Sequence, residues 1–156
     1  MMAVQPNGAG TGENAWTPEL TATTTAPDLG TGGTASGGWR YVDGALVFWW
    51  ALFVFGASPD PGSGKYQLAL PVTPISSNRP VAHGAVIDAS ASSEIRGVTA
   101  VVAPDLAAAL SGEETSTFIM DTSTPAGIVA ACIGDDAPFT WAEGDQINLC
   151  GIYQVG

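Results

Sequence analysis

The chain has 156 residues, a formal net charge of −11 and four basic residues, which lie far apart at Arg40, Lys65, Arg79 and Arg96. The length allows one domain with a packed core and is too short for two. Binding to nucleic-acid phosphates requires clustered Lys and Arg, so the sequence excludes nucleic acid as a partner.

Charged residues make up only 12% of the chain, whereas hydrophobic residues make up 46%. The low charge predicts a surface built largely of Thr, Ser, Gly and Ala. Such a surface is typical of a chain that is covered by copies of itself or by other proteins. It also fits a neutral, Thr-rich β surface, so both interpretations stay open.

The N-terminal residues are rich in Gly, Asn and Thr and show no hydrophobic periodicity. We expect an extended N-terminal arm over residues 1–15, held by a neighbouring subunit, and a β-sandwich domain over residues 16–156. The arm has neither the basic nor the apolar region of a signal peptide, so we expect synthesis in the cytoplasm. The candidate attachment residues of the arm are Met2, Val4, Pro6 and Trp16.

From Trp16 onward, glycine (20 residues in the chain) and proline (11 residues) separate short runs rich in Val, Ile, Thr and aromatic residues. A succession of short strands and turns predicts an all-β fold, either a β-sandwich or a jelly-roll-like domain. The expected strands lie near residues 19–25, 38–42, 45–55, 65–70, 81–88, 96–103, 116–121, 126–133 and 146–154.

The strongest local signal is the stretch from Trp39 to Val47, because Asp43-Gly44 can occupy the two positive-φ positions of a type I′ hairpin turn. The apolar run that follows, residues 45–55, is shorter than the ~20 residues that a membrane-spanning helix needs, so we expect no membrane partner.

Both sets of alternate side chains in this run are apolar, which is unusual for a strand with one wet face. One set can fill the sandwich core, and the other needs a second cover. A subunit interface would supply that cover, but so would other parts of the same chain. The two sets are Leu46, Phe48, Trp50, Leu52 and Val54, and Val47, Trp49, Ala51, Phe53 and Phe55.

Residues 104–110 are expected to form a short connecting helix, with Pro104 near its start and Gly112 past its end. Cys132 and Cys150 both lie in apolar runs. They are expected to be reduced and buried, although a disulfide between neighbouring strands is an alternative.

Chemistry-bearing residues are few. His83 is the only histidine, and the sequence has neither a nucleophile elbow nor a phosphate loop. The loop carboxylates could serve glycoside hydrolysis or bind calcium, but solvated turn residues are the simpler interpretation. We therefore expect no enzyme activity, no catalytic residue, no cofactor and no metal site. The loop carboxylates in question are Glu113, Glu114, Asp135, Asp136, Glu143 and Asp145.

Four aromatic residues could stack on sugars if they were exposed, or could anchor the core and an interface. They are Trp16, Trp39, Trp141 and Tyr153.

The order of short motifs along residues 16–155 resembles a β domain common in minor tail and fibre proteins of phages that infect actinobacteria, and also found in small virion proteins. The final segment, PFTWAEGDQINLCGIY (138–153), is the most specific part of the resemblance. The other matching motifs are Trp16-Thr17-Pro18, Pro27, Leu29, residues 30–34 (GTGGT), Gly38, Tyr41, Asp43-Gly44, Val47-x-Trp49, Phe55-Gly56, Gly62-Ser63-Gly64-x-Tyr66 and Leu70-Pro71-Val72.

The resemblance implies a trimeric β-sandwich or jelly-roll-like protein of the virion surface, with no cofactor and no catalytic residues. Long tail fibres place such a domain after a long attachment region or shaft, whereas only about fifteen residues precede it here. A capsid decoration or cement protein is therefore the leading hypothesis. The alternatives are a minor tail or tail-tip protein that binds a host receptor or glycan, and a polysaccharide depolymerase.

The expected partners are further copies of the chain in a homotrimer and the capsid or tail proteins of the phage. The candidate residues for the trimer interface or the core are Val47, Trp49, Phe53, Phe55, Trp141 and Tyr153.

Overall fold

The computed structural model describes residues 13–75, 79–90, 94–102, 117–121 and 132–156. These residues form an all-β fold, with no helix among them that could span a membrane. Their strands are β1 (Asn14–Trp16), β2 (Leu20–Ala22), β3 (Thr34–Asp43), β4 (Leu46–Val54), β5 (Tyr66–Leu68), β6 (Arg79–Asp88), β7 (Glu94–Val102), β8 (Thr117–Asp121) and β9 (Gln146–Gln154).

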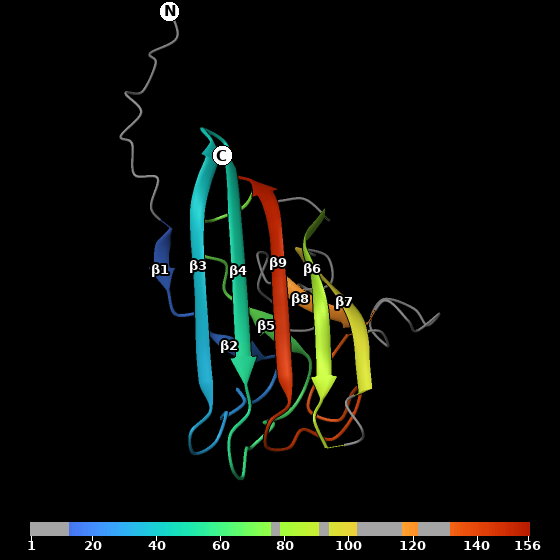
Figure 1. Cartoon of the computed structure of the whole chain (residues 1–156). Helices are drawn as coiled ribbons and strands as arrows, with labels where there is room; N and C mark the ends of the chain where they lie inside the picture. The colour runs from blue at the N-terminus through green and yellow to red at the C-terminus, as the bar shows by residue number, and fades with distance from the viewer. Residues whose placement is uncertain (1–12, 76–78, 91–93, 103–116, 122–131) are drawn as a thin grey trace, which may run out of the picture.

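Hydrogen bonds join these nine strands in one antiparallel order, β1-β3-β4-β9-β6-β7-β8-β5-β2. The sheet curves so that its strands lie in two layers (Figure 1). One layer contains β3, β4, β9, β6 and β7, and the other contains β8, β5 and β2 behind it. The architecture is thus all-β and sandwich-like, as the sequence predicts.

A single two-stranded ribbon crosses from one layer to the other. Its two arms keep one register over most of their length. Leu20 pairs with Leu68 in β2 and β5, Thr31 pairs with Ala57 in the connecting segments, and Tyr41 pairs with Val47 in β3 and β4. Each step toward the hairpin turn on one arm is matched by one step on the other arm. The two hairpin arms therefore contribute strands to both layers.

Between the strands of the two layers, both arms of the ribbon carry an Asp-x-Gly sequence. Asp28 and Asp60 face each other and exchange backbone hydrogen bonds of 2.8 and 3.0 Å. The carboxylate of Asp28 accepts a hydrogen bond from the Gly30 amide, and that of Asp60 accepts one from the Gly62 amide, each at 2.9 Å. Both glycines have positive φ, 82° and 68°, a conformation that side chains rarely adopt.

The two end strands of the sheet are consecutive in sequence. β1 and β2 are three residues long and are separated by Thr17-Pro18-Glu19. β1 pairs with residues 37–39 in the middle of β3, and β2 pairs with the whole of β5. The chain therefore passes from one end of the curved sheet to the other within a few residues.

The hairpin predicted around Asp43-Gly44 is confirmed, but the type I′ turn is wrong. The turn residues are Gly44 and Ala45, and Asp43 pairs with Leu46. Neither Asp43 nor Gly44 has a positive φ. The Asp43 carboxylate accepts a hydrogen bond from the Gly44 amide at 2.8 Å, and a register shift after Tyr41 absorbs the extra residue.

The core lies between the two layers and is rich in aromatic side chains. Trp141 stacks on Phe55 with ring centroids 4.6 Å apart and also contacts Tyr66 and Phe139. The Trp141 indole donates a hydrogen bond to the Gly134 carbonyl at 2.8 Å, so its one polar atom is satisfied within the apolar surroundings.

Eight of the strands coincide with predicted segments, and β1 was not predicted. The predicted helix at 104–110 lies outside the described residues, as does most of the predicted strand at 126–133. Of the expected arm, residues 1–12 also lie outside them, whereas Asn14 and Ala15 belong to β1.

Candidate assembly surface

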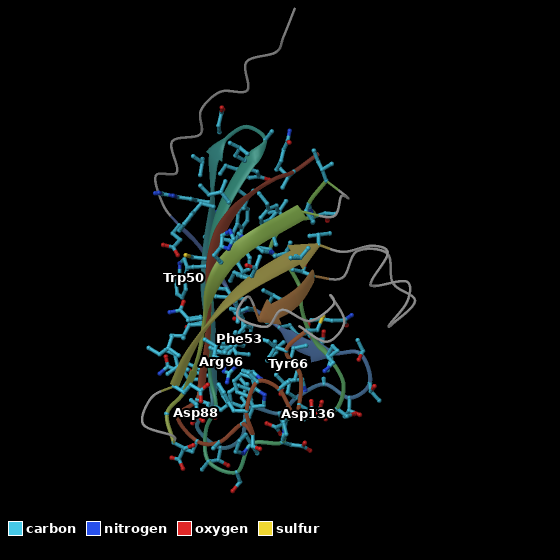
Figure 2. All side chains as sticks on the ribbon, turned by 90° about the vertical axis from the view of Figure 1, so that its right-hand side faces the viewer. Trp50, Phe53, Tyr66, Asp88, Arg96 and Asp136 are labelled. Atoms are coloured by element: carbon cyan, nitrogen blue, oxygen red, sulfur yellow. The ribbon has the colours of Figure 1, made fainter. Side chains whose placement is uncertain are left out.

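The strand β4 separates its two apolar sets onto opposite sides of its layer. Val47, Trp49, Ala51 and Phe53 are fully buried, and Phe55, just after the strand, is 1% exposed. Figure 2 shows Phe53 between the layers and Trp50 on the other side of the ribbon. All six candidates for interface or core are buried in the chain's own core: Val47, Trp49, Phe53, Phe55, Trp141 and Tyr153. They are therefore core residues and do not form an exposed interface.

The other set of β4 points away from the core. The register of the neighbouring strands shows which side chains share that side. We call this side of the layer the outer face. Its apolar members are Leu46, Phe48, Trp50, Leu52 and Val54 of β4, Ile152 of β9, Ile87 of β6 and Ile95 of β7.

The apolar side chains of the outer face are only partly covered. Ile95 is 65% exposed, Ile152 is 55% exposed and Leu46 is 38% exposed, while Phe48 and Trp50 are half-buried. A group of exposed apolar side chains on one side of a fold marks an interaction surface more often than an isolated exposed side chain does.

Charge is almost absent from the outer face. Along β3, β4 and β9 its positions hold one cation, Arg40, and one carboxylate, Asp43 opposite Leu46, beside neutral residues such as Ser36, Asn148 and Gln154. The Arg40 guanidinium carbon lies 5.6 Å from the centroid of the Phe48 ring, which is within the range of a cation–π interaction. The strands of the outer face therefore carry few charges, with the Arg40 guanidinium and the Asp43 carboxylate toward the hairpin end.

The described chain begins beside the outer face. The Glu13 carboxylate accepts a hydrogen bond from the Trp50 indole nitrogen. The same carboxylate lies where a Cβ atom at Gly38 would be, and Gly38 is the residue opposite Trp50. The absence of a side chain at Gly38 thus allows Glu13 to reach Trp50.

One row across the outer face brings together residues that are distant in sequence. Trp50, Cys150, His83 and Thr99 lie opposite one another on β4, β9, β6 and β7. His83 Nδ1 is 3.1 Å from the Thr99 hydroxyl. Sequence reasoning gave His83 no partner, because only the pairing of β6 with β9 places it next to Cys150.

The two cysteines have different environments. Both are free thiols; Cys132 is buried and Cys150 is exposed. The prediction that both are buried is thus right for Cys132 and wrong for Cys150, and the alternative of a disulfide is wrong. Burial raises the pKa of Cys132 to about 11, and this effect outweighs the opposite, smaller effect of the nearby Lys65 ammonium. Cys150 is therefore the accessible thiol of the pair.

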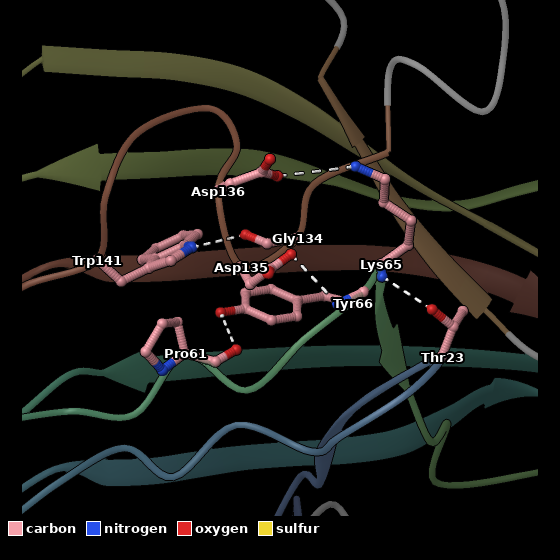
Figure 3. Close-up of polar contacts among 9 residues, drawn as sticks. Thr23, Pro61, Lys65, Tyr66, Gly134, Asp135, Asp136 and Trp141 are labelled. Atoms are coloured by element: carbon pink, nitrogen blue, oxygen red, sulfur yellow. Dashed lines mark hydrogen bonds and ion pairs between the residues drawn. The ribbon is translucent and has the colours of Figure 1, made fainter.

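The loop carboxylates on the opposite side of the core make structural contacts (Figure 3). Asp135 accepts a hydrogen bond from the Gly64 amide at 3.2 Å. Asp136 is 4.0 Å from the Lys65 ammonium, but its side chain is 81% exposed, so this ion pair contributes little.

Asp145 is fully buried. Its two oxygens accept hydrogen bonds from the Ala89 amide at 2.8 Å and the Ala142 amide at 2.7 Å. It therefore joins the turn after β6 to the loop before β9. Glu113 and Glu114 lie outside the described residues.

The aromatic candidates for sugar stacking divide into two groups. Trp141 and Tyr153 are 4% and 5% exposed, so neither ring is available to a sugar. Trp16 packs edge-on against Trp49 with centroids 5.8 Å apart, and this contact places it at the core rather than in a free attachment arm. Trp39 is half-buried and contacts Tyr41 edge-on at 5.4 Å.

Tyr41 was not a candidate, yet it is 54% exposed at the end of the β3–β4 hairpin. Among the described residues, no group of three or more His, Cys, Asp or Glu side chains is placed to hold a metal ion. The attachment candidates Met2, Val4 and Pro6 lie outside the described part of the chain.

No protein-family model, curated protein or solved structure matches the chain.

Proposed function

We propose that this protein is a non-enzymatic structural component of a bacteriophage particle, displayed on the virion surface as a homotrimer and acting as a capsid decoration or cement protein. The observation that carries the proposal is the outer face, on which apolar side chains of a regular β fold are only partly covered, with Leu46, Ile95 and Ile152 exposed. The order of motifs along residues 16–155 supports a β-sandwich head of this kind.

The proposed mechanism is linkage between binding and assembly. A protein that binds the assembled shell more tightly than the separated shell subunits stabilises the shell by the difference in binding free energy. The apolar core, with Trp49 and Phe53 fully buried, keeps the head folded at the particle surface. The arm residues Met2, Val4 and Pro6 are the proposed contacts with the shell.

The test uses particles that lack this protein, to which purified protein is added before heating. We expect the wild-type protein to bind the particles and to raise their disassembly temperature. A variant without residues 2–12 is expected to fold but to lose both effects. An unchanged disassembly temperature with saturating wild-type protein would rule out the cement role.

A second candidate function is a minor tail or tail-tip protein that binds a host receptor or glycan. It is favoured by the exposed ring of Tyr41 next to Trp39 and by the exposed Val42 beside them at the hairpin end, since aromatic rings at a protein's tip can stack on sugars. Purified protein would then compete with phage for adsorption to host cells, and Tyr41→Ala would remove the competition. Wild-type protein that does not slow adsorption would count against this function.

A further inference from the structure

We infer that the outer face of β3, β4, β9, β6 and β7 is the surface through which copies of this chain associate, with the β4 stripe Phe48, Trp50, Leu52 and Val54 at the centre of the contact. This inference deepens the proposed function, because it assigns the self-association to one surface and excludes the six core residues from it.

The charge of the chain favours a second copy as the occupant. Each copy carries a net charge of −11, so two copies repel each other wherever acidic residues meet. The outer face limits this repulsion, because β4 and β9 place no acidic side chain on it. The carboxylates near it are those of Asp43, at the hairpin end, and Glu13, which accepts the hydrogen bond from Trp50. A basic partner would find few carboxylates there, and an anionic lipid surface would find Arg40 as the only cation on β3, β4 and β9.

The composition of the outer face is that of an interface core. Interface cores are depleted in charged residues and enriched in aromatic residues, Met and Arg. Trp50 and Phe48 are the aromatic members here, and Arg40 already lies over the Phe48 ring. Trp and Arg are also the residues that most often dominate binding energy.

The size of the outer face is sufficient for a specific contact. The nine residues of β4 and the five strands of the layer span an area of roughly 700 Å² at ordinary strand rise and spacing. Stable protein–protein interfaces bury about 800 Å² on each partner. The face is therefore close to the required size.

Cys150 provides a reporter at the centre of this surface, because it is exposed and lies directly opposite Trp50. We expect a thiol reagent to modify Cys150 rapidly in dilute protein and at least about tenfold more slowly at concentrations where the chain is associated. Cys132 is buried and is expected to react only after denaturation. A Cys150→Ser variant shows which part of the measured thiol modification comes from Cys150.

The main test is sedimentation of full-length protein over a wide concentration range. We expect the wild-type chain to associate, and Leu52→Glu or Ile152→Glu to weaken association by at least about tenfold, because each places a carboxylate in the contact. Thr25→Glu is the control, since Thr25 is exposed and pairs with Ser63 in the segments that connect the two layers, outside the strands of the outer face. Circular dichroism checks that each variant is folded.

Several outcomes would overturn the inference. They are a wild-type chain that stays monomeric, a Cys150 reactivity that does not depend on concentration, and a loss of association in Thr25→Glu that equals the loss in Leu52→Glu. If removal of residues 2–12 from a monomeric chain increases Cys150 reactivity, the arm covers the outer face in place of a second copy. If Leu52→Glu does not fold, the Cys150 measurement on wild-type protein still decides.

The inference and the proposed function fail in different ways. Association through the outer face without binding to phage particles would refute the proposed function and leave the inference intact. Particle binding by a chain whose Cys150 stays reactive at every concentration would refute the inference alone.

Discussion

The indole nitrogen of Trp49 in β4 donates a hydrogen bond of 3.1 Å to the carbonyl oxygen of Val81 in β6, although β9 lies between these two strands. The residue of β9 opposite Trp49 is Gly151. A Cβ atom at Gly151 would lie 2.1 Å from the same Val81 oxygen. The lack of a side chain at Gly151 therefore allows one tryptophan to bind three strands of the layer together.

Replacement of Gly151 should disturb this contact. We expect Gly151→Ala to destabilise the fold by about 2 kcal/mol, because the added methyl group overlaps the Val81 carbonyl and backbone atoms must move. Urea denaturation followed by tryptophan fluorescence measures the change. The companion variant Trp49→Phe removes the hydrogen-bond donor and should also destabilise the fold. Equal stability of Gly151→Ala and wild type would contradict the described packing.

The two sides of β4 should respond differently to the same truncation. We expect Phe53→Ala to cost about 4 kcal/mol of unfolding free energy, since Phe53 is fully buried and its removal leaves a cavity. Phe48→Ala, on the half-buried outer side, should cost clearly less and should act mainly on self-association. Chemical denaturation at one protein concentration compares the two variants, and a reversed order would refute the assigned faces.

Asp145 should be the most important carboxylate for stability in the described part of the chain. Asp145→Ala leaves the Ala89 and Ala142 amides without their acceptor, and we expect a loss of about 3 kcal/mol. Asp136→Ala is the control, because an exposed side chain with a 4.0 Å ion pair should change stability by less than about 0.5 kcal/mol. Thermal unfolding of both variants tests the difference.

Alkaline pH should unfold the protein through its buried tyrosines. Burial raises the pKa of Tyr153 from 10.0 to about 12, and burial with the nearby Asp135 and Asp60 charges raises the pKa of Tyr66 even further. The folded chain holds these protons more tightly than the unfolded chain does. The stabilisation is therefore complete below pH 10 and is lost as the pH rises through 10 toward 12.

Tyr66→Phe tests this pH dependence, because phenylalanine cannot ionise. The variant loses the hydrogen bond of 3.0 Å from the Tyr66 hydroxyl to the Pro61 carbonyl, so it should be about 1 kcal/mol less stable at neutral pH. The difference from wild type should shrink as the pH rises above 10. Stability curves at several pH values measure it, and a constant difference would contradict the burial of Tyr66.

The sequence was sufficient to locate most strands and insufficient to orient the most hydrophobic one. The runs that became β4, β6 and β9 are long and bounded by turn residues, so their positions could be predicted. β1 has three residues and no alternation of apolar and polar side chains, so only its pairing with β3 reveals it. The turn at Asp43-Gly44 was placed correctly, but its type depends on the register shift after Tyr41.

The two faces of β4 could not be distinguished in advance, because both sets of side chains are apolar. The structure places the set with Trp49 and Phe53 inside, where Gly151 leaves space for the indole. The proximity of His83 and Cys150 could not be predicted either, because 66 residues lie between them in the chain. Only the pairing of β6 with β9 brings them together.

The short end strands limit how copies of this chain can add to one another at high concentration. A free strand edge is a template for adding further strands and for fibre growth. β1 occupies the middle of the edge of β3 and leaves only residues 34–36 and 40–43 unpaired there, while β2 offers three residues at the other end. Neighbouring molecules can therefore meet through their faces, while their strand edges offer little for filament growth.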